Sequence, residues 1–386
     1  MPDLPKTADI VIVGGGAVGT SIAYHLARRG GKVVLVEKEA IASGSTGRAA
    51  GLITQQFKTE LHIKLAQESL AFFKRLASSG EHGLVFRETG YLHLLCTPEE
   101  LAAAPRYVEL QRRLGIDSQL LTPAETARLV PGLETGDILG ATNCPQDGYT
   151  DPHLSTNAFV TLAKEYGAQV FTYTEVVGID VVDGRVQKVR TTRGDVQTRV
   201  VVNAAGPWAA LVGEMVGLDL PVRPFRRQLW FTLAVDEIAS DAPVLFDTNH
   251  DFYFRKEGAG VLMCLGNPAE PCGFDTTVDW SFAPKVAAYA THRFPPLAKA
   301  QIASAWAAPR DMTPDHEPIL GFIPGVEGFV TAAGGSGHGF MLAPAVGRLI
   351  AELILDGESS LDLAPLTIQR FLGKQFPLSA YSPVGA

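Results

Sequence analysis

One arginine stands directly ahead of three carboxylates in the stretch WAAPRDMTPDHEP, residues 306–318. Arg310 is followed by Asp311, Asp315 and Glu317, and it could form a surface ion pair with one of them. The guanidinium could also point inward and bind a carboxylate ligand, because its planar fork reaches both oxygens and keeps its charge. The residues alone leave both interpretations open, so the choice depends on what the rest of the chain binds.

A glycine-rich turn near the N-terminus joins two apolar runs. ADIVIV (8–13) is rich in β-branched residues and predicts a buried parallel strand, and KVVLVEK (32–38) predicts a second one. Between them, GGGAVG opens a stretch with helical apolar spacing, TSIAYHLARRG. A strand, glycine turn, helix, strand and acidic residue within about thirty residues are typical of a dinucleotide-binding unit.

Each residue of this unit has a physical role. Gly14 makes the tight turn, Gly16 lets the backbone approach a pyrophosphate, and Gly19 lets the helix pack against the strand. The helix N-terminus stabilises phosphate groups, and Glu37 can accept hydrogen bonds from a ribose. The motif by itself does not separate NAD from FAD.

Two further segments favour FAD over NAD. The stretch AIASGSTGRAAGLITQQF (40–57) is small, polar and glycine-rich, so it can run extended along a long cofactor instead of forming a third strand. FVTAAGGSGHGF (329–340) predicts a second strand that is followed by a glycine loop and then by the start of a helix. Two such glycine loops suit a cofactor with two ends, an ADP half and an isoalloxazine half.

Composition excludes several other functions. The chain has 33 Lys and Arg against 41 Asp and Glu, a net charge of -8, which argues against a nucleic-acid partner. The four cysteines are scattered, so neither a disulfide framework nor a zinc site is expected, and no metal is predicted. No apolar run reaches the roughly 18 residues of a membrane span, and no signal peptide is expected. We therefore expect a cytoplasmic protein.

The remaining elements predict two interwoven domains. Residues 61–78 have helical spacing, and TPEE (97–100) and TPAE (122–125) are capping boxes that should each open a helix. The expected fold class is α/β: a doubly wound, Rossmann-like FAD-binding domain interwoven with a domain rich in β-sheet. We assign 1–80, 150–217 and 305–386 to the FAD-binding domain and 81–149 and 218–304 to the substrate-binding domain.

The chain resembles the D-amino-acid oxidase family of flavoproteins, which includes glycine oxidase, sarcosine oxidases and the β-subunit type of L-proline dehydrogenase. Four segments carry the resemblance: IVIVGGGAVGTSIAYHLARRG, EKEAIASGSTGRAAGLI, VVNAAGPWA and GGSGHGFMLAPAVGRLIAELI. Within the family, the spacing of STGR, RETGYLHLL, DGYTDP and SGHGFMLAP is most similar to the branch of sarcosine oxidase β and proline dehydrogenase β.

The resemblance implies an FAD site along most of the chain. Residues implied at the ADP half are Gly14, Gly16, Ala17, Val18, Gly19, Glu37, Lys38 and, on the adenine side, Val176. Those implied along the pyrophosphate and flavin are Ser45, Thr46, Ala50, Gly51 and Leu52, with Ala205 and Gly206 from the central segment. Those implied at the pyrimidine end of the flavin are Gly335, Ser336, Gly337, His338, Gly339 and Phe340.

Some positions depart from the family pattern. Monomeric sarcosine oxidase attaches its flavin through a cysteine near the position of Ala308, so we expect non-covalent FAD here. The same relative has a lysine where this chain has Met341. In glycine oxidase and D-amino-acid oxidase an arginine after a W-A-G-L-type sequence binds the substrate carboxylate, and WAAPR places Arg310 at similar spacing. The acids that follow Arg310 are then expected to be loop residues and not its ion-pair partners.

Tyr253 and Arg255 are further substrate-binding candidates. They lie two residues apart in FYFR, so a strand would direct both to the same face. That face could cover the substrate or could be an ordinary solvent-facing pair. His338 is expected to shape its loop or contact the flavin, without acting as a base, and His62 and His93 have no motif that supports a role.

These features predict an FAD-dependent oxidase or dehydrogenase of a small amino or imino acid, such as glycine, sarcosine, a proline-like acid or a D-amino acid. Oxygen or another electron acceptor would take the electrons. The alternative is a flavin-bearing subunit of a hetero-oligomer that passes electrons to partner subunits or a quinone. Homo- or hetero-oligomers both remain open, as does an NAD-dependent dehydrogenase.

Overall fold

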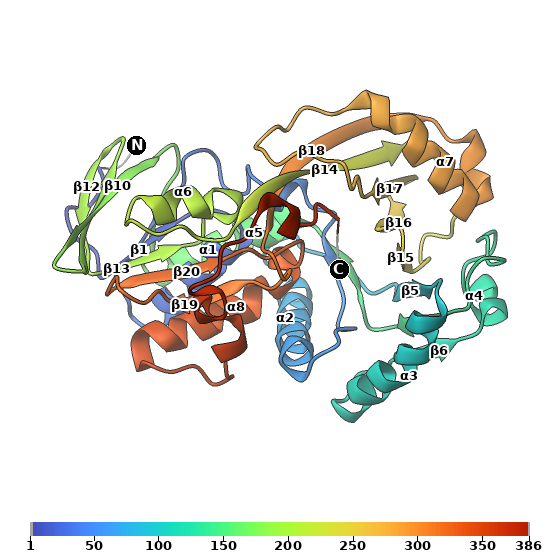
Figure 1. Cartoon of the computed structure of the whole chain (residues 1–386), viewed down its shortest axis with the longest axis horizontal. Helices are drawn as coiled ribbons and strands as arrows, with labels where there is room; N and C mark the ends of the chain where they lie inside the picture. Colours follow the sequence, from blue (N-terminus) through green and yellow to red (C-terminus); the bar gives the residue numbers. More distant parts are fainter. Residues whose placement is uncertain (1–2, 385–386) are drawn as a thin grey trace.

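The computed structural model describes residues 3–384 and contains two large sheets (Figure 1). The first sheet has six strands, which in spatial order are β19 (Ile319–Phe322), β20 (Phe329–Ala333), β13 (Val200–Asn203), β1 (Ile10–Val13), β2 (Val33–Val36) and β9 (Gln169–Phe171). Neighbouring strands are parallel except for β19 and β20. This is the predicted α/β fold class with a doubly wound sheet.

Alternate residues of β1 explain why this sheet is covered on both faces. Ile10 and Ile12 pack with the helices on one face, whereas Val11 and Val13 pack on the other. The first face carries α1 (Ala17–Arg28), α2 (Glu60–Ser79), α5 (Pro152–Glu165) and α8 (Gly339–Asp356). The second carries α6 (Ala209–Glu214) and the antiparallel meander β10 (Val176–Val182), β11 (Arg185–Thr191) and β12 (Gly194–Gln197).

The second sheet has eight strands and lies to the right in Figure 1. In spatial order they are β18 (Ile302–Met312), β14 (Arg223–Thr232), β17 (Gly260–Leu265), β16 (Phe252–Glu257), β15 (Val244–Asp247), β5 (Tyr91–Leu95), β7 (Gly140–Cys144) and β6 (Gln119–Leu121). Helix α7 (Ala283–Arg293) packs on its outer face through Val286 and Ala290.

The two predicted capping boxes open helices. Thr97 caps α3 (Pro98–Arg113), and Thr122 caps α4 (Pro123–Leu129), each through reciprocal bonds with the glutamate three residues later. A small sheet links the domains and consists of β3 (Leu52–Ile53), β8 (Gly148–Thr150) and β4 (Phe86–Arg87). Short 3₁₀ helices are η1 (Thr46–Arg48), η2 (Gly206–Trp208), η3 (Trp280–Phe282), η4 (Pro295–Lys299), η5 (Ala364–Leu366), η6 (Ile368–Phe371) and η7 (Leu378–Ala380). Among the described helices, none is long and apolar enough to cross a membrane.

Two predicted domain boundaries fall inside strands: the one between residues 149 and 150 cuts β8, and the one at residue 305 cuts β18. A division at residue 305 would cut β18, which pairs with β14 from Ile302 to Met312 and belongs to the eight-stranded sheet. The pairing of β18 with β14 joins segments far apart in the sequence, and no local pattern encodes it. We therefore propose that the last part of the FAD-binding domain begins after Met312.

Candidate active site

A cavity of about 570 Å³ runs from the carboxyl ends of β1, β2, β13 and β20 to the inner face of the eight-stranded sheet. A crevice at the carboxyl ends of parallel strands is where doubly wound sheets bind ligands. Every predicted cofactor-binding residue lines this cavity except Gly19 and Ser336. No group of His, Cys, Asp and Glu within residues 3–384 could hold a metal ion.

The glycine turn between β1 and α1 has no space for a side chain at Gly14 or Gly19. Gly14 has a φ of +115°, and a Cβ there would lie 2.4 Å from the carbonyl oxygen of Ala204. A Cβ on Gly19 would lie 2.0 Å from the carbonyl oxygen of Gly14, so Gly19 acts through packing and does not reach the cavity. Gly16 lines the cavity at the start of α1, and its N-cap position carries no side-chain hydrogen bond. The backbone N–H of Ala17 donates to the hydroxyl of Thr46 at 3.1 Å, and the rest of the first turn of α1 is open to an anionic group.

Glu37 closes the far end of this turn. Its carboxylate accepts hydrogen bonds from the backbone N–H groups of Gly15 at 2.6 Å and Glu39 at 2.9 Å. Lys38 beside it lies 3.6 Å from the ring centroid of Trp208. An acid fixed in this way at the end of the second strand is placed to accept ribose hydroxyl groups.

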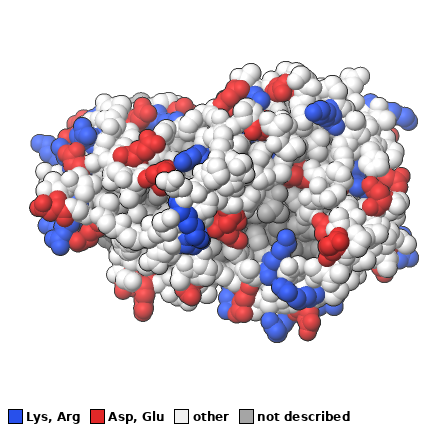
Figure 2. Space-filling view, in the orientation of Figure 1, with Lys and Arg blue, Asp and Glu red and all other residues white. Residues whose placement is uncertain are grey.

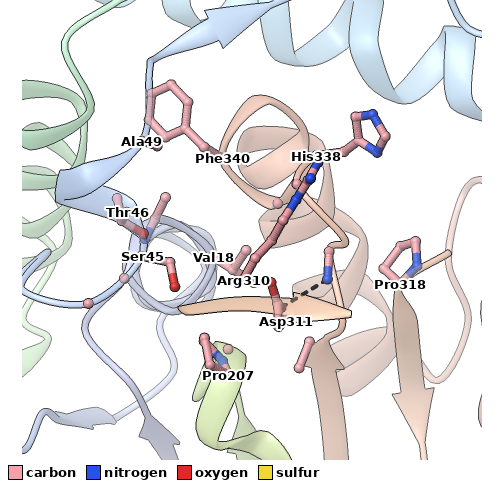
Figure 3. Close-up of a pocket in the computed structure, with 18 of the residues that line it drawn as sticks. Val18, Ser45, Thr46, Ala49, Pro207, Arg310, Asp311, Pro318, His338 and Phe340 are labelled. Atoms are coloured by element: carbon pink, nitrogen blue, oxygen red, sulfur yellow. Dashed lines mark hydrogen bonds between the residues drawn. The ribbon is translucent and has the colours of Figure 1, made fainter. Parts of the chain in front are cut away.

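The small, polar segment of residues 40–57, here called the cofactor-side segment, is attached to β18 by three hydrogen bonds. Ser45 donates its hydroxyl to the carbonyl of Pro309. Arg48 donates to the carbonyl of Ala307 at 3.3 Å, and the indole of Trp306 donates to the carbonyl of Arg48 at 3.0 Å. The cofactor-side segment and the strand that carries Arg310 therefore form one wall (Figure 3).

The second glycine loop is held by an acid that sequence analysis placed in a loop. Asp311 lies on β18 and accepts the backbone N–H groups of Gly334 at 2.8 Å and Gly335 at 2.9 Å through one oxygen (Figure 3). The N–H of Ser336 bonds to the carbonyl of Asp311, so Ser336 shapes the loop from outside the cavity. The expectation that the acids after Arg310 are loop residues is therefore wrong for Asp311.

Arg310 extends from β18 into the cavity toward His338 (Figure 3). Its Nη1 atom is buried and has no hydrogen-bond partner among residues 3–384. The two loop carboxylates are engaged elsewhere: Asp315 pairs with Arg370 at 2.7 Å, and Glu317 pairs with His62 at 2.6 Å. The surface ion-pair interpretation of Arg310 is therefore wrong. Burial and the neighbouring charge of Arg227 lower the pKa of Arg310, but a guanidinium remains protonated.

The two candidates on β16 separate. Tyr253 lines the cavity, and burial raises the pKa of its phenol well above the usual value, so the hydroxyl is neutral. Arg255 is buried outside the cavity lining: it donates to the carbonyl of Ala50 at 3.0 Å and lies 4.0 Å from the ring centroid of Tyr149. Tyr253 and Arg255 point to the same face of β16, as predicted, but the segment around Ala50 covers that face at Arg255. Arg255 therefore anchors this segment and does not reach the cavity.

Sequence reasoning missed Arg227. It lines the cavity from β14 and forms a buried ion pair with Asp251 at 2.6 Å. No local pattern distinguishes Arg227 from Arg226, which faces the other side of the same strand and pairs with Glu270 at 2.7 Å. The face of each side chain depends on the pairing of β14 with β18.

Several histidines also line the substrate end of the cavity. Burial lowers the pKa of His93 to about 4, and burial together with the charge of Arg310 lowers that of His338 to about 3. The same two causes lower the pKa of His316. All three are therefore neutral at pH 7, and Arg310 keeps its charge without an added positive imidazolium beside it.

The comparisons with known proteins identify the family. Residues 9–353 match the family model DAO, described as FAD dependent oxidoreductase. The chain belongs to this family. The glycine turns, the open N-terminus of α1 and the fixed Glu37 carboxylate fit FAD, and the NAD-dependent alternative is thereby set aside.

Two relatives match nearly the whole chain. Glycine oxidase of Geobacillus kaustophilus (strain HTA426) is 32% identical over 375 residues, which are 95% of this chain and 98% of the relative. The crystal structure of L-proline dehydrogenase from P. horikoshii superposes with a TM-score of 0.90 and 36% identity, over 97% of this chain and 100% of that one.

A longer relative matches only in part. Mitochondrial sarcosine dehydrogenase of Mus musculus is 32% identical over 386 residues, which are 95% of this chain but 42% of the relative. This chain therefore spans less than half the length of that dehydrogenase.

Proposed function

We propose that this chain oxidises the C–N bond of a small amino or imino acid whose carboxylate binds Arg310. The observation that carries the proposal is that Arg310 lines the cavity that joins both glycine loops, while its buried Nη1 atom has no hydrogen-bond partner among the described residues. An unpaired buried cation is costly, and a bound carboxylate would relieve that cost.

Each group at the cavity has a separate role in the proposed reaction. FAD supplies the hydride acceptor for the substrate carbon that carries nitrogen. Arg310 holds the carboxylate, and Tyr253 lines the same cavity with a neutral phenol. The eight-stranded sheet covers the substrate and limits the access of water. The product is an imine, which water hydrolyses when it is open-chain and which persists when it is cyclic.

The relatives support the substrate class through their names. Glycine oxidase, L-proline dehydrogenase and sarcosine dehydrogenase are named for glycine, L-proline and sarcosine. Glycine, sarcosine, proline-like acids and D-amino acids are therefore the candidates for this chain. We propose non-covalent binding of FAD, because no cysteine is present in the described lining of the cavity.

The electron acceptor defines a second candidate function. Two of these relatives are named dehydrogenases and one an oxidase, which supports both oxygen and another acceptor. As a dehydrogenase, the chain would pass electrons to partner subunits or a quinone, within a homo- or hetero-oligomer. The free cysteines in the described chain support a reducing compartment, and we propose the cytoplasm.

A substrate panel tests the proposal. Purified holoprotein is mixed anaerobically with single amino and N-methyl amino acids, and flavin absorbance is followed. The proposal predicts bleaching by at least one member of the panel, and absence of bleaching by all of them would contradict it. Oxygen consumption compared with dye reduction under argon then separates an oxidase from a dehydrogenase.

A further inference from the structure

Four rings form a continuous aromatic wall on the inner face of the eight-stranded sheet: Tyr91 and His93 of β5, Phe246 of β15 and Tyr253 of β16. All four line the cavity. Phe246 stands directly opposite His93 on one side and Tyr253 on the other, so the side chains share a face. Ring centroids lie 4.8 Å apart for Tyr91 and His93, 5.6 Å for His93 and Phe246, and 6.2 Å for Phe246 and Tyr253.

The wall lies within the electrostatic reach of Arg310. The positive charge of Arg310 opposes the burial that raises the pKa of both Tyr91 and Tyr253. A ligand whose carboxylate binds Arg310 therefore extends its remaining atoms beside these rings. Phe246 is the central ring and has no polar atom to offer.

Three other ionisable side chains at this end of the cavity already have polar partners. Arg227 pairs with Asp251 at 2.6 Å, and Glu317 pairs with His62 at 2.6 Å. Asp311 accepts two backbone N–H groups. Lys58 also lines the cavity and its charge reaches His93, but Lys58 is exposed. Arg310 is thus the buried cation to which a single carboxylate can bind.

We propose that the aromatic wall selects substrates with one carboxylate and an apolar body of several carbons that packs flat against Phe246, in preference to glycine and to dicarboxylic acids. This inference rests on the proposed function and names its substrate class. An apolar body buries its surface against the rings, and each methylene in such a pocket changes discrimination by about 10–200-fold. A second carboxylate would instead meet the negative ring faces and no free buried cation.

Three carboxylates that cannot be oxidised test the wall without turnover: acetate, cyclopentanecarboxylate and glutarate. Calorimetric titration of the holoprotein should show cyclopentanecarboxylate binding at least about tenfold more tightly than acetate. Glutarate should bind no more tightly than acetate. Equal affinities for acetate and cyclopentanecarboxylate, or the highest affinity for glutarate, would overturn the inference.

Phe246→Ala removes the centre of the wall. The variant should lose about tenfold or more in affinity for cyclopentanecarboxylate while its affinity for acetate is unchanged. Phe246→Leu, which keeps an apolar side chain but removes the flat ring, gives the same comparison if the alanine variant fails to retain FAD. Phe322→Ala is the matched control, because Phe322 is exposed on β19 and does not line the cavity. Equal losses for both ligands in the Phe246 variants would contradict a selective wall.

Amino acid substrates distinguish a failure of the proposed function from a failure of the aromatic-wall inference. If no amino acid bleaches the flavin, the proposed function fails, whatever the carboxylates show. If glycine or iminodiacetate bleaches it with a higher kcat/KM than proline, the proposed function stands and the aromatic-wall inference fails. Preference for proline, lost in Phe246→Ala, supports both.

Discussion

The guanidinium of Arg310 lies directly against the backbone of Gly337. A Cβ on Gly337 would lie 1.7 Å from Nη2 of Arg310, and Gly337 has a φ of +96° that side-chain-bearing residues rarely adopt. Asp311, the next residue of β18, holds the start of the same glycine loop. One strand therefore fixes both Arg310, the cation proposed to bind the carboxylate, and the loop predicted to contact the flavin.

Gly337→Ala should displace the guanidinium of Arg310. Because a misplacement of about 1 Å can cost about 10²-fold in rate, we expect kcat/KM to fall by about that factor, mainly through KM. Steady-state kinetics with the best substrate of the panel measure the change. Gly273→Ala is the control, since a Cβ there meets no atom within 4 Å. Equal kinetics in the Gly337 variant and the wild type would show that this contact does not position Arg310.

Gly19→Ala should abolish retention of FAD. The added Cβ would lie 2.0 Å from the carbonyl oxygen of Gly14, so the first glycine turn would have to open. The ratio of flavin to protein absorbance after purification measures the effect. Gly30→Ala is the comparison, because Gly30 has a φ of +88° in open space and should cost only about 1–2 kcal/mol in stability. Full FAD content in the Gly19 variant would refute the packing argument.

Asp247→Asn should destabilise the substrate domain. Asp247 and Arg293 are both fully buried and lie 3.0 Å apart, so the variant leaves the arginine without its buried counter-charge. Loss of one partner of a buried pair costs about 3–5 kcal/mol, which urea unfolding would detect. Asp137 pairs with the same arginine from a site that is 41% exposed, and Asp137→Asn should cost clearly less. Equal losses would contradict this ranking.

Acidification should destabilise the protein below pH 6.5. Burial lowers the pKa of His25 to about 4, that of His93 to about 4 and that of His338 to about 3. The unfolded chain therefore binds more protons between those values and pH 6.5, so stability falls with decreasing pH. Each histidine adds a slope of about 1.4 kcal/mol per pH unit in that window.

His25→Gln offers a clean test of this slope, because His25 lies on α1 outside the cavity lining. The variant should show a shallower decline of unfolding free energy between pH 6.5 and about 4 than the wild type. The measurement is urea unfolding across that pH range. Identical slopes would show that His25 is not held neutral by burial.

The parts of the fold that depend on local patterns were predictable. The β-branched runs at β1 and β2, the glycine turn between them and the capping boxes at Thr97 and Thr122 each follow from short-range physics. The glycine loops and the element pattern also favoured FAD and predicted two interwoven domains, and the family resemblance added the individual residues implied at the cofactor. Lys and Arg are interspersed with Asp and Glu over the face shown in Figure 2.

What could not be predicted depends on pairing between distant segments. Alternation placed Tyr253 and Arg255 on one face, but it could not show that the segment at Ala50 covers Arg255. Arg227 faces the cavity because of the pairing of β14 with β18, and it is held there by the ion pair to Asp251. The aromatic wall likewise needs the register of three strands, which no single segment encodes.

Anaerobic reduction of the bound flavin in the wild type and in Arg310→Ala tests the central claim most directly. The claim predicts that an amino or imino acid bleaches the wild-type flavin and that the variant retains FAD. The variant should need about 30-fold or more substrate for half-reduction, because removal of one partner of a buried charge pair costs about 2–5 kcal/mol. Arg185→Ala, which removes an exposed arginine of β11, should behave as the wild type. Unchanged substrate dependence in Arg310→Ala would contradict the account.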